Sequence, residues 1–224
     1  LQVFLPLRLF CQVFFESSVL LEAEGRTFPV AVEYRDPFES ENSSRGDSGV
    51  LEEALEAILD LETRYRDHLL CFLPTERDIQ DLANLLQKEL DERFEILPLY
   101  GRMSPGEQKK VFKSTTKTRI VLATNIAETS LTIPGIAYVV DSGTARISRY
   151  NAQARIQGLP VEEISQASAR QRTGRAGRVK PGVCIRLYSE KNFLDRDAYT
   201  EPEIRRSNLA NVVLLLRSLD LSAE

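Results

Sequence analysis

Short continuous apolar runs alternate along this chain with segments of helical periodicity, and this alternation constrains the fold more than any other feature. The runs at 68–74 (HLLCFLP), 118–124 (TRIVLAT) and 136–143 (IAYVVDSG) are typical of strands buried on both faces. Segments 50–65 and 75–91 carry apolar residues at helical spacing. The pattern therefore predicts an α/β fold, with an open, mostly parallel sheet and helices on both faces.

A protruding β-hairpin is also predicted. Residues 145–161 have two strand-like halves around the turn sequence YNAQ. The polar segment 36–49 is rich in turn residues and is expected to be a loop. Further strands are expected at 28–35, 94–100 and 182–189, and further helices at 104–113, 164–172 and 201–221.

Cysteine and histidine usage argues against a metal site. The three cysteines lie far apart and form no C-x-x-C pair. His68 is the only histidine in the chain that could join them as a metal ligand. We therefore expect no metal ligands, and reduced thiols in a cytoplasmic protein. His68 is interpreted as a structural residue, because no serine or cysteine in a matching context accompanies it.

The amino end differs from the rest of the chain. Residues 1–15 are nearly all apolar, but Pro6 interrupts the run, which is too short to span a bilayer. No later segment has the pattern of a membrane span, so no membrane partner is expected. We interpret residues 1–24 as an unplaced remnant of a preceding domain, in a chain that is a fragment of a larger protein.

Charge is segregated along the chain, although the net charge is only −4. Residues 164–189 hold six basic residues and no acid, and residues 142–157 hold three more basic residues and no acid. A basic stripe in an acidic protein predicts a localised anionic partner, such as phosphate groups. Charge alone leaves a solvated basic surface as the alternative.

The segment QRTGRAGR (171–178) spaces three arginines at intervals of three, with glycines beside two of them. At a helix end, Arg172, Arg175 and Arg178 would lie along one side. Each such guanidinium can donate two hydrogen bonds to the oxygens of one phosphate, and its charge stabilises the negative charge on a transferring phosphoryl group. Gln171 adds a polar group that can orient an attacking water. An RNA-binding or merely exposed basic helix end remains the alternative.

Some parts of a nucleotide site are missing from the sequence. It has no G-x-x-x-x-G-K-[ST] phosphate loop and no D-E-x-x tetrad that would hold magnesium. The segment ATNIAETSLTIPGIAYVVDSG (123–143), however, offers small hydroxyl and amide groups suited to phosphate and ribose oxygens. Ligands bind at the carboxyl ends of strands in such sheets, so we expect 123–143 and 171–178 to share a site.

These two segments together resemble motifs V and VI of the DEAH-box helicases of superfamily 2. The longer run 143–194 is similar, more specifically, to the bacterial HrpA type of ATP-dependent RNA helicase. The resemblance covers residues 24–221. It implies a RecA-like fold of the P-loop NTPase type that lacks its own P-loop, with a second RecA-like domain at 25–200 and the start of a winged-helix domain at 201–224.

The resemblance also implies roles for individual residues. Arg175 and Arg178 match the arginine fingers, and Gln171 matches the water-positioning residue. The positions that match nucleotide-binding residues are Phe112, Ser130, Arg172 and Thr132. The predicted nucleic-acid-binding residues are Thr75, Thr124, Asn125, Arg146, Arg149 and Arg155. Two alternatives remain open here: Phe112 as a core residue, and Arg172 as an internal contact that fixes the turn.

The function implied is that of the second motor domain of an ATP-dependent 3′-to-5′ RNA helicase. ATP would be clamped between two RecA-like domains, with Mg²⁺ held by the first of them, which this chain lacks. RNA and that first domain are the expected partners, and the isolated chain is expected to be inactive as an NTP hydrolase. The alternatives are a non-catalytic RNA-binding RecA-like module and an inert gene fragment.

Overall fold

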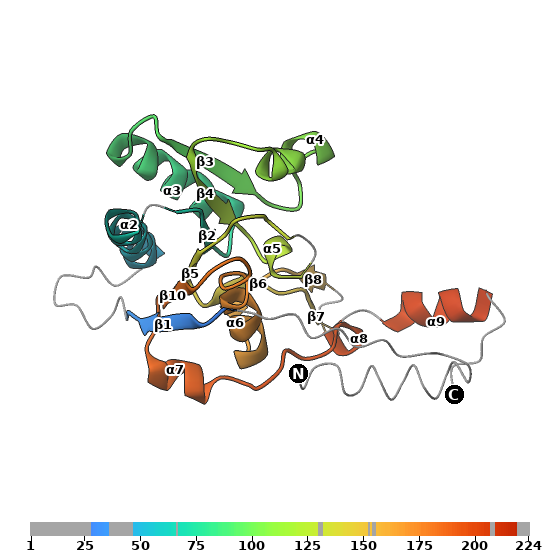
Figure 1. The fold of residues 1–224 in the computed structure, drawn as a ribbon. Coiled ribbons are helices and arrows are strands. Elements are labelled where there is room, and N and C mark those ends of the chain that lie inside the picture. Colours follow the sequence, from blue (N-terminus) through green and yellow to red (C-terminus); the bar gives the residue numbers. More distant parts are fainter. Residues whose placement is uncertain are drawn as a thin grey trace, which may run out of the picture.

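Six parallel strands form the central sheet, in the order β1-β10-β5-β2-β4-β3 (Figure 1). The computed structural model describes residues 28–35, 47–65, 67–129, 132–151, 153, 156–206 and 209–218. The sheet strands are β1 (Val30–Tyr34), β2 (Leu69–Phe72), β3 (Phe94–Leu99), β4 (Thr118–Ala123), β5 (Tyr138–Asp141) and β10 (Gly182–Arg186). The predicted mostly parallel α/β sheet is therefore confirmed.

Helices cover both faces of this sheet. The described helices are α2 (Asp47–Arg64), α3 (Glu76–Glu89), α4 (Pro105–Gln108), α5 (Ile126–Thr129), α6 (Gln166–Thr173), α7 (Glu190–Asp195), α8 (Glu203–Arg206) and α9 (Leu209–Ser218), of which α9 extends away from the sheet (Figure 1). One core cluster lies under α2 and α3 and includes Ile58 and Leu82. The cluster on the opposite face includes Val111, Ala127 and Ala176, so the arginine segment packs on that face.

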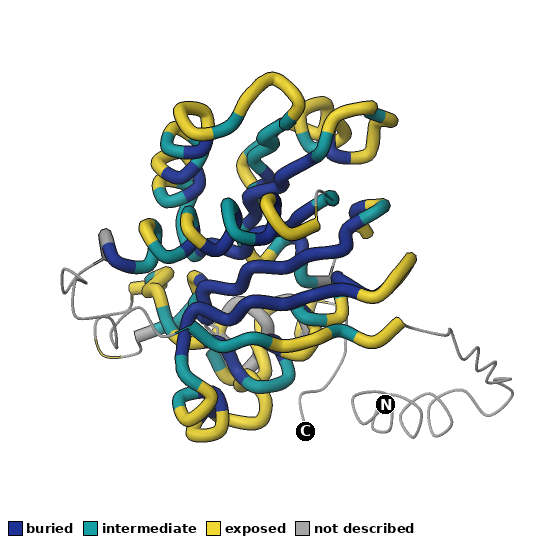
Figure 2. Tube along the Cα trace, turned by 60° about the vertical axis from the view of Figure 1, so that its left-hand side comes forward, coloured by how far each residue is buried: buried dark blue, intermediate teal, exposed yellow. Residues whose placement is uncertain are grey.

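The continuous apolar runs are explained by burial from both sides. On β2, Leu69 and Cys71 belong to the cluster under α2 and α3. The alternate residues Leu70 and Phe72 belong to the opposite cluster. All four are at most 1% exposed. Figure 2 shows the same pattern, with the central strands dark blue and the edges of the molecule largely exposed.

The predicted hairpin is present as two short antiparallel ladders. β6 (Thr144–Arg146) pairs with β9 (Val161–Glu163), and β7 (Arg149–Asn151) pairs with β8 (Ile156–Gly158). The apolar residues Ile156 and Leu159 are 63% and 57% exposed, respectively. The hairpin lies beside α8, away from the helices α2 and α3 (Figure 1).

Three expected elements differ in their limits. Residues 104–113 form α4 followed by a 3₁₀ turn, η1 (Lys109–Phe112), rather than one helix. The carbonyls of Val111 and Lys113 accept hydrogen bonds from the Arg119 guanidinium at 2.7 Å each, so side-chain donors hold this end of the segment. Residues 201–221 contain α8 and α9 rather than one described helix, and α2 begins at Asp47, within the expected loop.

The other expectations for segments concern the amino end and membranes. The unplaced segment 1–24 lies outside the described residues, as do Cys11, Ser130 and Arg155. Cys71 and Cys184 are buried free thiols. Among the helices of the described part, none is both long and apolar enough to cross a membrane.

Candidate RNA groove and arginine site

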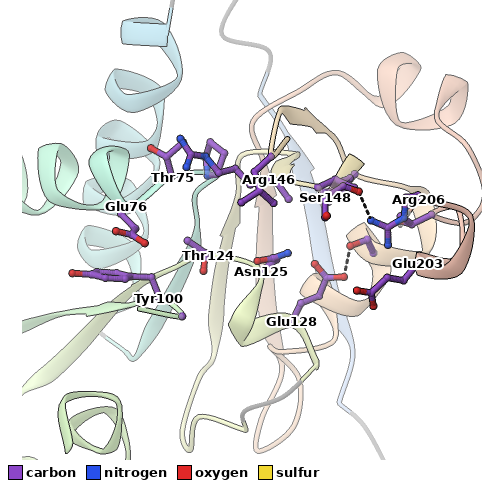
Figure 3. Close-up of a pocket in the computed structure, with 18 of the residues that line it drawn as sticks. Thr75, Glu76, Tyr100, Thr124, Asn125, Glu128, Arg146, Ser148, Glu203 and Arg206 are labelled. Atoms are coloured by element: carbon purple, nitrogen blue, oxygen red, sulfur yellow. Dashed lines mark hydrogen bonds between the residues drawn. The ribbon is translucent and has the colours of Figure 1, made fainter. Parts of the chain in front are cut away.

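A groove of about 570 Å³ lies at the carboxyl ends of three neighbouring strands (Figure 3). It is bordered by the segments that follow β2 (74–76), β3 (100–102) and β4 (124–125). These segments converge because β2, β4 and β3 are adjacent in the sheet and parallel. Hairpin residues 145–148, α8, Glu128 of α5 and Ser168 of α6 form further parts of the walls.

The structure brings four of the predicted nucleic-acid-binding residues to this groove: Thr75, Thr124, Asn125 and Arg146. Thr75 is also the N-cap of α3. Its hydroxyl donates to the Asp78 carboxylate at 2.6 Å and accepts from the Asp78 N–H at 3.1 Å. The Thr75 hydroxyl is therefore engaged in capping the start of α3, while Asn125 and Arg146 are exposed.

Arg149 differs from the expectation of a cation that faces RNA. Its guanidinium contacts Glu162 at 2.9 Å and Glu201 at 2.8 Å, and it does not line the groove. The two acids come from β9 and from the segment before α8, outside the acid-free stretch that motivated the prediction. We therefore interpret Arg149 as a structural residue whose ion pairs connect the hairpin with the segment before α8.

The arginine segment ends α6 and turns sharply against the sheet edge. Gly177 has a φ of +63°, and a Cβ there would lie 2.7 Å from the main-chain oxygen of Phe28. The Gly177 carbonyl accepts from the Phe28 N–H at 2.7 Å. A residue with a side chain rarely adopts this positive φ, and its Cβ would clash with the Phe28 main chain. Gly177 is therefore required for this turn.

Arg175 and Arg178 leave this turn toward one recess, which Thr132 also lines. The exposed Arg178 donates to the Thr132 hydroxyl at 3.0 Å. Arg175 is half-buried and donates to the main-chain oxygen of Glu128. Burial, and then the nearby charge of Arg178, lowers the pKa of Arg175, whereas Glu128 raises it.

The other predicted residues of the nucleotide side have different surroundings. Phe112 is 39% exposed, while the neighbouring Val111 is fully buried in the same cluster as Ala176. Phe112 is therefore not a core residue, and it lies on the face of the sheet that carries the arginine turn. Gln171 is exposed in the last turn of α6. Ser130 lies outside the described residues.

The expectation that Arg172 binds nucleotide is corrected by its burial. Arg172 is 1% exposed and donates to Asp141 at 2.7 Å and to Glu128 at 3.1 Å. Its guanidinium also lies 4.8 Å from the ring centroid of Phe72. The two acids are 31 and 44 residues away in sequence, so the local charge count could not reveal them. Arg172 therefore makes the internal contact that fixes the turn, which is the alternative to a nucleotide-binding role.

Glu128 connects the groove with the arginine turn and was missed as a connecting residue by the sequence reasoning. Its side chain lines the groove and accepts from Arg172 and Ser168. Its main-chain oxygen accepts from Arg175. A signal was present, because Glu128 is the one acid between Glu107 and Asp141.

This fold is the RecA-like fold of a helicase C-terminal domain. The chain matches the family described as helicase conserved C-terminal domain over residues 51–180, and it belongs to that family. The RecA-like fold and the resemblance to HrpA-type DEAH helicases are both confirmed by the relatives described next.

Three relatives illustrate the similarity. The chain is 50% identical over 207 residues to the ATP-dependent RNA helicase HrpA of Escherichia coli K12, covering 92% of this chain and 16% of that protein. It is 34% identical over 218 residues to the human probable ATP-dependent RNA helicase DHX35, covering 92% of this chain and 30% of that protein. The crystal structure of the E. coli DEAH/RHA helicase HrpB matches with a TM-score of 0.80 and 33% identity, over 94% of this chain and 26% of that chain.

Proposed function

We propose that this chain is the second motor domain of an ATP-dependent 3′-to-5′ RNA helicase. In this proposal residues 25–200 form the RecA-like domain and residues 201–224 begin the winged-helix domain that follows. The observation that carries the proposal is the connection of two sites through Glu128. One residue lines the groove with its side chain and holds Arg175 with its main chain.

Arg175 and Arg178 are proposed to act as arginine fingers on ATP held mainly by the first RecA-like domain. The contacts of the Arg178 guanidinium among the described residues are two neutral oxygens, the Thr132 hydroxyl and the Gly174 carbonyl. The Arg178 guanidinium can therefore exchange these two oxygens for phosphate oxygens without breaking an ion pair with a carboxylate. An arginine supplied in this way is worth about 10³–10⁵ in rate.

The remaining nucleotide contacts follow from the face on which the arginine turn lies. Phe112, exposed on that face, is proposed to stack on adenine, with Thr132, Ser130 and Gln171 near the phosphates. We assign Mg²⁺ to the first RecA-like domain, because this sequence has no magnesium-binding tetrad after a strand.

The groove is proposed to hold half of the RNA track. Thr124 and Asn125 precede α5 and face the groove between Tyr100 and Arg206 (Figure 3). Arg146 supplies a positive charge, and among the described residues no carboxylate forms an ion pair with it. Hydroxyl, amide and guanidinium groups of this kind bind the nucleic-acid backbone without reading its bases. This favours a track for a moving strand.

An ATPase and RNA-binding comparison tests the proposal. In the longer protein that carries this domain, Arg175→Ala should abolish RNA-stimulated ATP hydrolysis and leave RNA affinity unchanged. Arg170→Ala is the matched control, because Arg170 is exposed on α6 and contacts Gln166 and Phe193 instead.

The 224-residue chain alone should bind RNA in a salt-sensitive way and hydrolyse no ATP. A non-catalytic RNA-binding module is the alternative function, and it predicts no loss of hydrolysis on Arg175→Ala. RNA-stimulated hydrolysis by the isolated chain would contradict the assignment of the phosphate loop to another domain.

A further inference from the structure

The segment after β3 is a wall of the groove to which the sequence reasoning gave no role. β3 pairs with β4 so that Leu99 lies opposite Ala123, and the Thr124 N–H donates to the Leu99 carbonyl at 3.1 Å. This register brings the segment 100–102 beside Thr124 and Asn125. Figure 3 places Tyr100 on one side of Thr124 and Arg206 on the far side of Asn125.

The three arginines that line the groove differ in how firmly they are held. Arg206 donates to the main-chain oxygens of Glu201 at 2.7 Å and Ser148 at 3.1 Å. Arg102 has an 84% exposed side chain, and its recorded ion pair is with Glu76 at 3.8 Å, the outer limit of such a contact. An exposed pair of this kind contributes little, so the Arg102 guanidinium can exchange it at small cost.

We propose that Arg102 is a further RNA-binding residue, which exchanges Glu76 for a backbone phosphate of the strand at Thr124 and Asn125. This inference rests on the proposed RNA track. A guanidinium binds phosphate oxygens through two parallel N–H donors, which a carboxylate at 3.8 Å does not engage fully. The space around the neighbouring Gly101 is open, since a Cβ there would meet no atom within 4 Å.

Glu76 has a defined part in the same exchange. Its carboxylate lines the groove and competes with RNA for Arg102. It also adds a negative charge where phosphates must lie. Removal of the Glu76 charge should therefore strengthen RNA binding, whereas removal of Arg102 should weaken it. Opposite effects from two partners of one ion pair would not arise if the pair only supported the fold.

Binding of a fluorescein-labelled single-stranded oligouridylate to the 224-residue chain, followed by fluorescence anisotropy at several KCl concentrations, tests the proposal. Arg102→Ala should weaken binding roughly threefold to tenfold. It should also reduce the slope of log affinity against log salt by about 0.7, the loss of one phosphate contact on a single strand. Glu76→Gln should tighten binding at low salt.

Arg77→Ala is the matched control. Arg77 is 89% exposed, pairs with Asp81 at 3.5 Å and does not line the groove. Equal effects of Arg77→Ala and Arg102→Ala, or weaker binding by Glu76→Gln, would overturn the role of Arg102. In either case a loss of affinity on Asn125→Ala would leave the proposed track standing. If the wild-type chain bound RNA without salt dependence, the track itself would fail, and Arg102 with it.

Discussion

Helix α6 and the turn that follows it, residues 174–178, place arginines in opposite environments. Arg172 is 1% exposed and bonded to Asp141 and Glu128. Arg178 is exposed and bonded to a hydroxyl and a carbonyl oxygen. A buried guanidinium is tolerated when carboxylates pair with it, whereas an exposed one keeps its charge for a ligand. The comparison teaches that equal spacing of one residue type does not imply one role.

The largest expected effect tests the ligand side of this comparison. In a protein that joins this domain to the proposed first RecA-like domain, Arg178→Ala should lower the ATP turnover rate about 10³–10⁵-fold, because the proposed arginine finger would be lost. The melting temperature should barely change, since Arg178 is exposed. Steady-state ATPase assays and thermal unfolding measure the two quantities. A stability loss as large as that of Arg172→Ala would remove the contrast between the two arginines.

Arg172→Ala tests the structural side. Removal of one partner of a buried ion pair leaves Asp141 and part of Glu128 uncompensated, and should lower the free energy of unfolding by about 3–5 kcal/mol. Urea unfolding followed by circular dichroism measures this change. Arg170→Ala, on the exposed side of α6, is the control and should have a small effect. An unchanged unfolding midpoint for Arg172→Ala would show that the buried network is not stabilising.

Glu62 extends the comparison to a buried charge with no partner. It is 5% exposed, and neither carboxylate oxygen has a hydrogen-bond partner within the described structure. Burial raises the pKa of Glu62 from 4.5 to about 7. The folded state therefore holds this proton more tightly than the unfolded chain, and stability should fall as pH rises from about 4.5 through about 7.

Glu62→Gln should remove the loss of folding stability that accompanies the rise in pH. The variant should be more stable than wild type by roughly 1–3 kcal/mol at pH 8, where an unpaired buried charge is most costly, and nearly equal at pH 4.5. Urea unfolding midpoints at both pH values provide the measurement. Equal stabilisation at the two pH values would exclude titration of Glu62 as the cause.

The smallest expected effect separates two residues of the groove. Thr75→Ala removes the N-cap of α3 and should cost about 0.5–2 kcal/mol of stability. Asn125→Ala removes an exposed side chain and should leave stability within about 0.5 kcal/mol, while it weakens RNA binding. Thermal unfolding and anisotropy titrations distinguish them. Unchanged stability in Thr75→Ala would return its hydroxyl to the candidates for RNA contact.

The groove shows how far residue types predict a site. Thr124 and Asn125 follow a recognisable buried strand, so their place at its carboxyl end could be predicted. The segment 100–102 carries no comparable signal, and it reaches the groove because β3 pairs with β4. The contribution of α8 was missed for the same reason: its proximity to the hairpin depends on contacts such as Arg206 to Ser148, 58 residues apart.

The sequence by itself determined the parallel sheet, because strands buried on both faces must be continuously apolar over short runs, as in β2, β4 and β5. It also determined the turn at Gly177 and the two arginines that leave it, since their local spacing is visible in eight residues. Only the tertiary structure decided which charges stay available. Asp141 and Glu128 neutralise Arg172, and Glu162 and Glu201 neutralise Arg149, because folding brings together groups that lie far apart along the chain.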